Sequence, residues 1–371
     1  DGVKSFADSF DKLLLNIEEK RARLVAQEHL HPNVSLGAEL PEVEGTLTGL
    51  QEHDVMGRIW RKDHTVWKSD PKEISNRLGW LNATDLMNEQ IPMLKAFAQE
   101  IQAAGYHHIV LLGMGGSSLG PEVLRQTFGS IPGYPELIVL DSTIPACVRR
   151  VTEDIEPSRA LFVVSSKSGG TIETLSLYQH FNRMIEQKLG ENVSGQNFVA
   201  ITDPGTSLAE LANQEGFRRI FLNPSDIGGR YSVLSYFGLL PAGLAGIDIT
   251  ALLDRAGSMR EGCPPYTDAH TNPAAWLGAV IGTLANTGRD KLTLVTSPAI
   301  GSLGLWVEQL LAESTGKEGK GIMPVAGEPL TAPKYYGDDR LFVYSRLEGD
   351  DNEDTDTAIK NIQESGQPIV R

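Results

Sequence analysis

The stretch ALFVVSSKSGGT, residues 160–171, decides the fold of this chain. Its first five residues are apolar, which is typical of a buried strand. Its last seven contain four hydroxyl residues and two glycines, and an amphipathic segment begins near Thr171. We therefore predict a strand, a tight loop and a helix N-terminus. The first turn of a helix offers unpaired N–H groups and the positive end of its dipole, so this loop is predicted to hold a phosphate.

An alternative interpretation of the loop, without a ligand, is a polar turn with a helix cap at Ser168 or Gly170. Capping uses one hydroxyl. It does not account for four hydroxyls, two glycines and Lys167 within seven residues, so the phosphate seat remains the favoured prediction.

Apolar strand patterns alternate with helix patterns on both sides of this stretch. Such alternation predicts an α/β fold in which parallel sheets lie between helices, a three-layer αβα arrangement. The predicted strands of a first unit are 108–112, 137–140, 161–164, 198–201 and 220–222, and those of a second are 292–296, 322–325 and 341–344. The second unit has few strands, so we expect it to be truncated.

The predicted domains follow from these patterns. Residues 1–28 read as a helix, and 29–53 as a linker because they are rich in Pro, Gly and Glu without periodicity. Residues 54–245 form a first domain, in which a cap with three tryptophans precedes the strands. Residues 246–371 form the second, incomplete domain.

Composition narrows the class of partner. The net charge is −15 and no basic run occurs, which argues against nucleic acid and against an anionic membrane surface. No apolar run approaches the length of a membrane span. Cys147 and Cys263 are far apart and lack metal-ligand spacing, so we expect no metal site and a reducing, cytoplasmic location. A small phosphorylated metabolite remains compatible with this charge.

The loop GMGGSSLG, residues 113–120, follows the first predicted strand. It resembles a dinucleotide fingerprint, and Asp141 lies where a ribose-binding acid belongs, but Ser118 occupies the third glycine position. A plain tight turn is a second interpretation. In a third, Gly115 and Gly116 let the backbone approach a ligand while Ser117 supplies a hydroxyl.

Two further positions carry chemistry. Arg230 follows paired glycines, of which Gly229 is the second, and either forms a structural ion pair or reaches a ligand, where a guanidinium stabilises an oxyanion. Glu313 lies in the last turn of a predicted helix over 302–315, where the dipole disfavours ionisation of a buried carboxylate and suits a general base. The alternative is an exposed Glu313 paired with Lys317 at i+4.

Four segments together resemble glucose-6-phosphate isomerases of the bacterial kind: GMGGSSLGPEVLRQTFG, FVVSSKSGGTIET, GGRYSVLSYFGLLPAGLAGID and WVEQLLAESTGKEGKGIMPV. They occur in the family's order, and the resemblance covers about residues 54–326. Residues 1–24, DGVKSFADSFDKLLLNIEEKRARL, look like the last helix of a transaldolase. The chain thus resembles the junction of a transaldolase/glucose-6-phosphate isomerase fusion that serves glycolysis, gluconeogenesis and the pentose phosphate pathway.

The resemblance implies two sugar-isomerase (SIS) domains and a sugar phosphate substrate. It implies that Arg230 lies near C1 and C2, that Glu313 moves the proton between them through a cis-enediolate, and that no metal or organic cofactor takes part. It implies a phosphate site formed by Ser117, Ser166, Lys167, Ser168 and Thr171, near the backbone of Gly115, Gly116 and Gly229. The family is often dimeric, and its ring-opening His and late Lys lie downstream of anything that matches here.

Two other functions stay open on sequence alone. One is a non-catalytic SIS module that binds a sugar phosphate. The other is a nucleotide-binding dehydrogenase that depends on Asp141.

Overall fold

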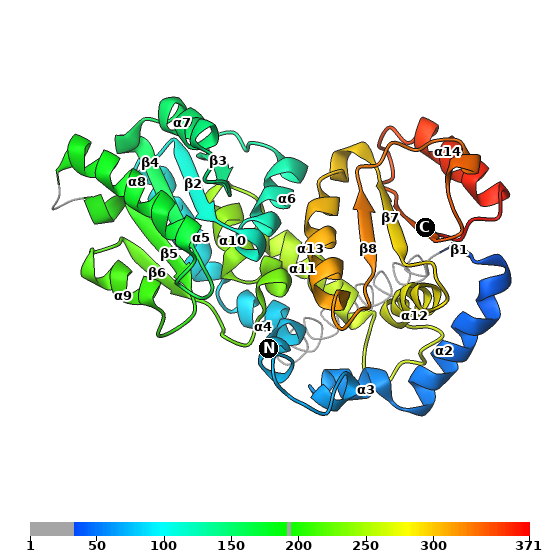
Figure 1. Ribbon diagram of the computed structural model, residues 1–371. Coiled ribbons are helices and arrows are strands. Elements are labelled where there is room, and N and C mark those ends of the chain that lie inside the picture. Colours follow the sequence, from blue (N-terminus) through cyan, green and yellow to red (C-terminus); the bar gives the residue numbers. More distant parts are fainter. Residues whose placement is uncertain (1–32, 191–193) are drawn as a thin grey trace, which may run out of the picture.

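The computed structural model describes residues 33–190 and 194–371, which form two α/β units side by side (Figure 1). The predicted helix over 1–28 lies outside the described residues. The α/β class is confirmed, because each unit contains a five-stranded sheet with helices packed on it. Within the described residues, no helix has the length and apolar character needed to cross a bilayer.

The first sheet is parallel throughout, with strand order β3-β2-β4-β5-β6. The strand β4 coincides with the predicted apolar run. It is completely buried, because helices cover both faces of the sheet. All five predicted strands of this unit are confirmed within two residues. They are β2 (His108–Gly113), β3 (Glu136–Leu140), β4 (Ala160–Ser165), β5 (Phe198–Thr202) and β6 (Arg219–Leu222).

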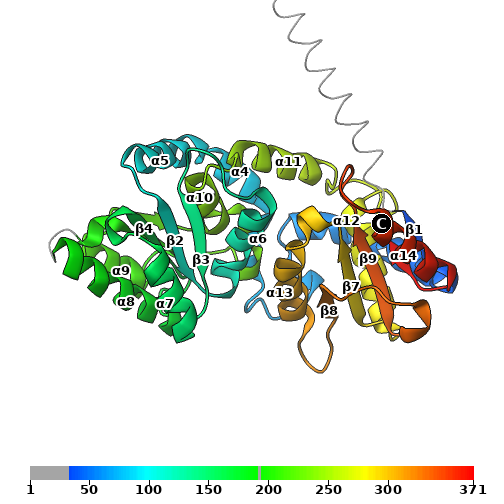
Figure 2. The same cartoon turned by 90° about the horizontal axis from the view of Figure 1, so that it is seen from above.

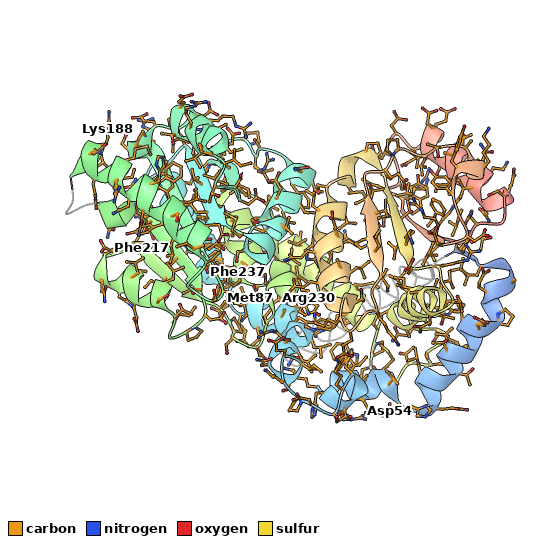
Figure 3. The ribbon with its side chains drawn as sticks, in the orientation of Figure 1. Asp54, Met87, Lys188, Phe217, Arg230 and Phe237 are labelled. Carbon is orange, nitrogen blue, oxygen red and sulfur yellow. The ribbon has the colours of Figure 1, made fainter. Side chains whose placement is uncertain are left out.

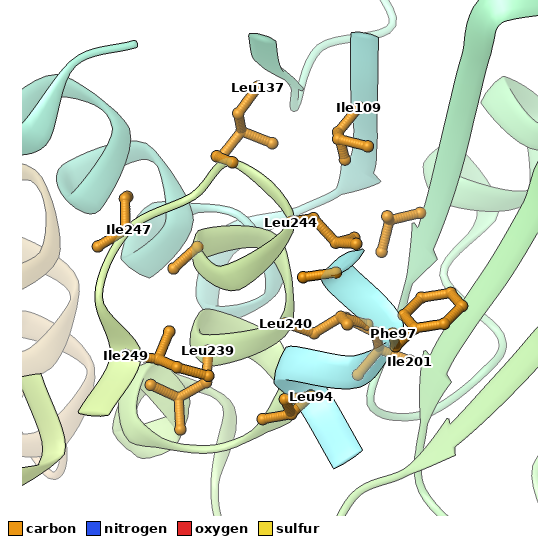
Figure 4. Close-up of a cluster of buried hydrophobic side chains, with 14 of the residues drawn as sticks. Leu94, Phe97, Ile109, Leu137, Ile201, Leu239, Leu240, Leu244, Ile247 and Ile249 are labelled. Carbon is orange, nitrogen blue, oxygen red and sulfur yellow. The ribbon is translucent and has the colours of Figure 1, made fainter. Parts of the chain in front are cut away.

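Residues of β4 alternate between two hydrophobic clusters, as the period of two in a strand requires. Leu161 and Val163 pack in one cluster with α5 (Ile91–Ala103), α6 (Leu119–Phe128) and α10 (Tyr236–Leu244), part of which Figure 4 shows. Phe162 and Val164 pack in the other. The helices on that face are α7 (Pro145–Asp154), α8 (Ile172–Leu189) and α9 (Ser207–Gln214).

The second sheet has the order β1-β10-β9-β7-β8. Three of its strands were predicted, and residues 368–371 read from the sequence as the start of a fourth, which is β10. The strands β10 and β1 are only two residues long: β10 pairs in parallel with β9, and β1 pairs antiparallel with β10. The strands are β1 (Val34–Ser35), β7 (Lys291–Thr296), β8 (Met323–Ala326), β9 (Arg340–Ser345) and β10 (Ile369–Val370). That the second domain is truncated stays a prediction.

The predicted linker over 29–53 is wrong for the residues that the structure describes. Val34–Ser35 pairs with the second sheet, and α2 (Leu40–Glu52) buries Val43 and Leu47 against α12 (Pro273–Asn286). Figure 1 shows α2, in blue, beside the second unit that the chain completes much later. Proline is tolerated in the first turn of a helix, where its missing N–H has no intrahelical partner to lose, so Pro41, the second residue of α2, does not prevent the helix.

The predicted cap over 54–80 is ordered and bridges the two units. It contains α3 (Val55–Trp60), whose Trp60 donates from Nε1 to the carbonyl of Cys263 at 3.0 Å. Near its end, the backbone N–H of Gly79 donates to the carbonyl of Asp226 at 2.9 Å. Figure 2, seen from above, shows α13 (Leu303–Thr315) of the second unit facing α6 of the first. The carboxyl edge of the first sheet therefore meets a helix of the second unit.

Candidate active site

The loop after β2 comes into backbone contact with the loop that carries Arg230. Gly115 has a φ of 55°, which favours glycine, and it opens the 3₁₀ turn η5 (Gly115–Ser117). A Cβ on Gly116 would lie 2.4 Å from the carbonyl carbon and oxygen of Gly229. Ser232 also donates from Oγ to the carbonyl of Gly116 at 3.2 Å. These glycines were predicted to let the backbone approach a ligand closely. At Gly116 the backbone instead closely approaches a second protein loop, the one that contains Gly229.

The loop after β4 is held by its own hydroxyls. Ser166 Oγ lies 2.9 Å from Thr171 Oγ1 and accepts the N–H of Gly169 at 3.1 Å. Thr171 stands at the N-cap position of α8 without capping it, since its hydroxyl is turned to Ser166. Among the described residues, the N–H groups of Lys167, Ser168 and Thr171 have no acceptor. The loop therefore has donors left for an anion.

Ser117 lies next to this loop, as predicted. Its carbonyl accepts the hydroxyl of Ser165 at 3.3 Å, and both residues are buried. A Cβ on Gly113 would lie 3.2 Å from the Cβ atoms of both serines, so a larger residue there would push the two loops apart. The GMGGSSLG loop and the SSKSGGT loop thus form one continuous surface at the carboxyl ends of β2 and β4.

The side chain of Lys167 is bound within the protein. Its ammonium forms an ion pair with Asp203 and donates to the carbonyl of Ser225 at 2.9 Å. Burial raises the pKa of the Asp203 carboxyl, and the neighbouring Lys167 ammonium acts in the opposite direction. Of the donors of Lys167, the backbone N–H is the one that remains for a phosphate in this loop.

Arg230 and Glu313 meet across the boundary between the two units. Arg230 lies in the 3₁₀ segment η8 (Gly229–Leu234) and donates from Nη1 to Glu313 Oε1 at 2.9 Å. Its Nε donates to Ser314 Oγ at 2.8 Å, and its Cζ lies 4.7 Å from the centre of the Tyr231 ring. Figure 3 labels Arg230 where the first unit adjoins α13. The structural ion pair that was one interpretation of Arg230 is therefore formed with Glu313, the candidate base.

The surroundings of Glu313 differ from the expectation in one respect. The side chain is half exposed, whereas the general-base interpretation from the sequence applied to a buried carboxylate. The alternative pairing with Lys317 is also not found, because that ammonium donates to the backbone carbonyl of Glu313 at 2.6 Å. The carboxylate of Glu313 is held by Arg230 instead.

The sequence analysis missed Gln309, which lies one helical turn before Glu313 on α13. Its Nε2 is 3.0 Å from the position of a Cβ on Gly115, and its buried Oε1 has no partner among the described residues. Trp306, on the same helix face, donates from Nε1 to the carbonyl of Arg230 at 3.0 Å. The spacing of Trp306, Gln309 and Glu313 places them on one helix face, and that periodicity was the signal available in the sequence.

Solved structures with a similar fold support the fold class. A crystal structure of a hypothetical protein from Thermus thermophilus covers 91% of this chain and 87% of its own, with a TM-score of 0.71 and 23% identity. A glucose-6-phosphate isomerase from Chlamydia trachomatis covers 94% of this chain and 85% of its own, with a TM-score of 0.67 and 18% identity. At these identities the likeness shows the two-sheet fold alone.

Sequence comparison identifies the family. The model of the family described as phosphoglucose isomerase matches residues 81–323. The glucose-6-phosphate isomerase of a Cyanothece species is 32% identical over 327 residues, and that of Staphylococcus saprophyticus is 30% identical over 329 residues. The matches cover 82% and 85% of this chain, but 58% and 74% of the two relatives. The chain belongs to the phosphoglucose isomerase family and spans about three fifths of the length of the cyanobacterial relative.

Proposed function

We propose that the protein interconverts glucose 6-phosphate and fructose 6-phosphate by moving a proton between C1 and C2. The observation that carries the proposal is the pairing of Arg230 with Glu313 from two different units, near a loop in which three backbone N–H groups have no acceptor among the described residues. Family membership supports the same reaction, since the curated relatives are named glucose-6-phosphate isomerase.

The phosphate occupies the seat formed by Ser166, Ser168 and Thr171, with the N–H of Lys167 and the hydroxyl of Ser117 alongside. A dianion is well matched to backbone N–H groups at the start of a helix. Anchored at that end, the open-chain sugar extends toward η8 and α13. Holding the substrate by its non-reacting end fixes C1 and C2 in place for the chemical step.

Glu313 is the proposed base. After ring opening it removes the proton from C2, and the electrons of that C–H bond form a C1–C2 double bond while the C1 carbonyl oxygen takes up the negative charge of a cis-enediolate. The same carboxyl group then returns the proton to C1, and the C2 hydroxyl becomes the carbonyl as its proton moves to the C1 oxygen. Arg230 holds the enediolate oxygen that carries the developing charge. For this step the ion pair between the two side chains opens, and substrate oxygens replace the carboxylate on the guanidinium.

The experiment that tests the base is Glu313→Gln, measured as isomerisation rate and as affinity for fructose 6-phosphate. We expect turnover to fall about 10³-fold, the range for loss of a general base, while affinity changes little. Glu308→Gln on an exposed part of the same helix is the matched control and should keep full turnover. Turnover that survives in Glu313→Gln would rule out this assignment.

A non-catalytic sugar-phosphate module is the second candidate. It is favoured by one observation, the half-exposed Glu313 that is already paired with Arg230. This candidate predicts that the wild-type chain binds fructose 6-phosphate but shows no turnover, and that a protein extended downstream of Arg371 shows none either. Assaying both proteins separates the candidates.

Three finer predictions belong with this proposal. Residues 1–24 are the end of a transaldolase, which reading the gene upstream of Asp1 tests. The protein forms a homodimer, which light scattering of the chain tests. It acts in the cytoplasm on a free sugar phosphate, without nucleic acid, membrane, metal or organic cofactor.

A further inference from the structure

We propose that Asp203 is a charge-masking residue of the phosphate seat: it neutralises Lys167, so that N–H groups and hydroxyls hold the phosphate and the affinity stays moderate. The inference rests on the proposed function, because it concerns the same seat. It assigns a role to Asp203, which lies just after β5 and is not part of the predicted site.

The contact between Asp203 and Lys167 involves both side chain and backbone. The carboxylate pairs with the ammonium, and the N–H of Asp203 donates to the carbonyl of Lys167 at 3.3 Å. The side chains are only 14% and 20% exposed. The ammonium also donates to the carbonyl of Ser225, so it is held on the side of β5 and β6. The pairing is therefore a built feature of the loop.

The segment after β5 also supports the rest of the seat. Ser207 donates from Oγ to the carbonyl of Gly169 at 2.9 Å. A Cβ on Gly169 would lie 2.5 Å from the Cβ of Thr206, whose hydroxyl is in turn 2.7 Å from that of Thr202. Residues 202–207 thus form the layer on which the phosphate loop rests, and Asp203 is the charged residue of that layer.

The charges around Asp203 show what its removal would change. Besides Lys167, the carboxylate faces Arg77 and Asp226, and Asp226 pairs with Lys62 at 3.5 Å. One oxygen of Asp203 is buried without a partner among the described residues. A hydrogen bond from a cation to a phosphate is about twice as strong as a neutral one. Freeing Lys167 from its partner should therefore strengthen phosphate binding, and removing the ammonium alone should leave a negative charge that repels phosphate.

The test measures affinity for fructose 6-phosphate and for inorganic phosphate by calorimetry, with the chain of residues 1–371. For Asp203→Asn we expect about fivefold tighter binding, which weakens more steeply with added salt than in the wild type. For Lys167→Met we expect about tenfold weaker binding, because Asp203 is left unpaired. The double variant should return to within about threefold of the wild type, which is the coupling expected of two residues in contact.

Glu39→Gln is the matched control, because Glu39 forms a comparably buried ion pair with Arg289 in the second unit. It should leave both affinities unchanged. If Lys167→Met and the double variant are equally weak, Lys167 contacts the phosphate directly and the inference is wrong. Affinities that are equal in all variants overturn it as well.

Two further outcomes are distinguishable. Should Asp203→Asn not fold, Lys167→Met and the double variant still decide the point, since masking predicts a clear difference between them and direct contact predicts none. If the wild-type chain binds neither phosphate compound, the proposed function itself fails. Binding by the wild type without a response to the variants contradicts the masking role alone.

Discussion

The two sheets share one strand order but have different loops at the same edge. Read from one edge of each sheet, the order β3-β2-β4-β5 in the first sheet corresponds to the order β8-β7-β9-β10 in the second. The loop after β4 is the proposed phosphate seat, and its counterpart after β9 is the segment over 346–352. The first contains hydroxyls and glycines, whereas the second begins the acidic run EGDDNEDTD, residues 348–356.

Several polar groups of the loop after β9 are used within the protein. Asn352 donates from Nδ2 to the carbonyls of Leu347 and Asp350, at 2.7 and 3.1 Å, and accepts the hydroxyl of Ser297 at 2.6 Å. Ser297 also accepts the N–H of Leu347, and Asp350 accepts the N–H of Ala299, at 2.7 and 2.8 Å. These groups are therefore not available to an anion. The acidic run is mostly exposed and spans the end of this loop and the first turn of α14 (Glu353–Glu364).

A cavity of about 410 Å³ lies at this edge of the second sheet, lined in part by Thr296, Glu328 and Asp354. Its acidic side chains disfavour a phosphate, although its position matches that of the first-unit site. We infer from this difference that the strand order determines where an anion can bind, while backbone and hydroxyl donors without an acceptor determine whether one binds.

The largest effect on this comparison should come from Gly116→Ala, which forces apart the two loops of the first unit. The added Cβ meets the Gly229 backbone, which has little room to move, so we expect a loss of about 3 kcal/mol in the free energy of unfolding. Gly282→Ala in α12 is the control, because nothing lies within 4 Å of its added Cβ. Urea unfolding of both variants checks this, and equal stabilities would show that the backbone contact is unimportant.

A smaller and more selective effect should come from the paired variants Ser166→Ala and Ser297→Ala. Ser166→Ala removes the hydroxyl that orders the seat, so affinity for fructose 6-phosphate should fall about tenfold, as for one lost hydrogen bond to a charged group. Ser297→Ala leaves the Leu347 N–H unpaired and removes one of the donors to Asn352 Oδ1, so unfolding free energy should fall by about 2 kcal/mol with affinity unchanged. Each variant is the control for the other. Parallel losses of affinity in both would mean that the second loop also serves phosphate.

Much of the fold was predictable because the central strands β2, β4 and β5 are almost completely buried and are therefore mostly apolar. The segment over 33–53 was not, because β1 is too short to show a period and α2 gains its stability from packing on α12. Local composition carries no record of that distant contact.

Within the candidate site, the sequence located the loops but not the partners of the charged residues. The partners of Lys167 and Arg230 are Asp203 and Glu313, 36 and 83 positions away in the chain. Only the packing of β5 beside β4, and of α13 beside η8, brings these pairs together. Gln309 was missed for the same reason, since Gly115 approaches it from the other unit.

The central claim is that the first unit alone holds phosphate, and hydrogen exchange with and without saturating fructose 6-phosphate tests it most directly. We predict slower exchange of the backbone N–H groups over 113–118 and 166–172, and no change over 346–352. Protection of residues 346–352, or protection absent from residues 166–172 while the ligand is bound, would contradict this account.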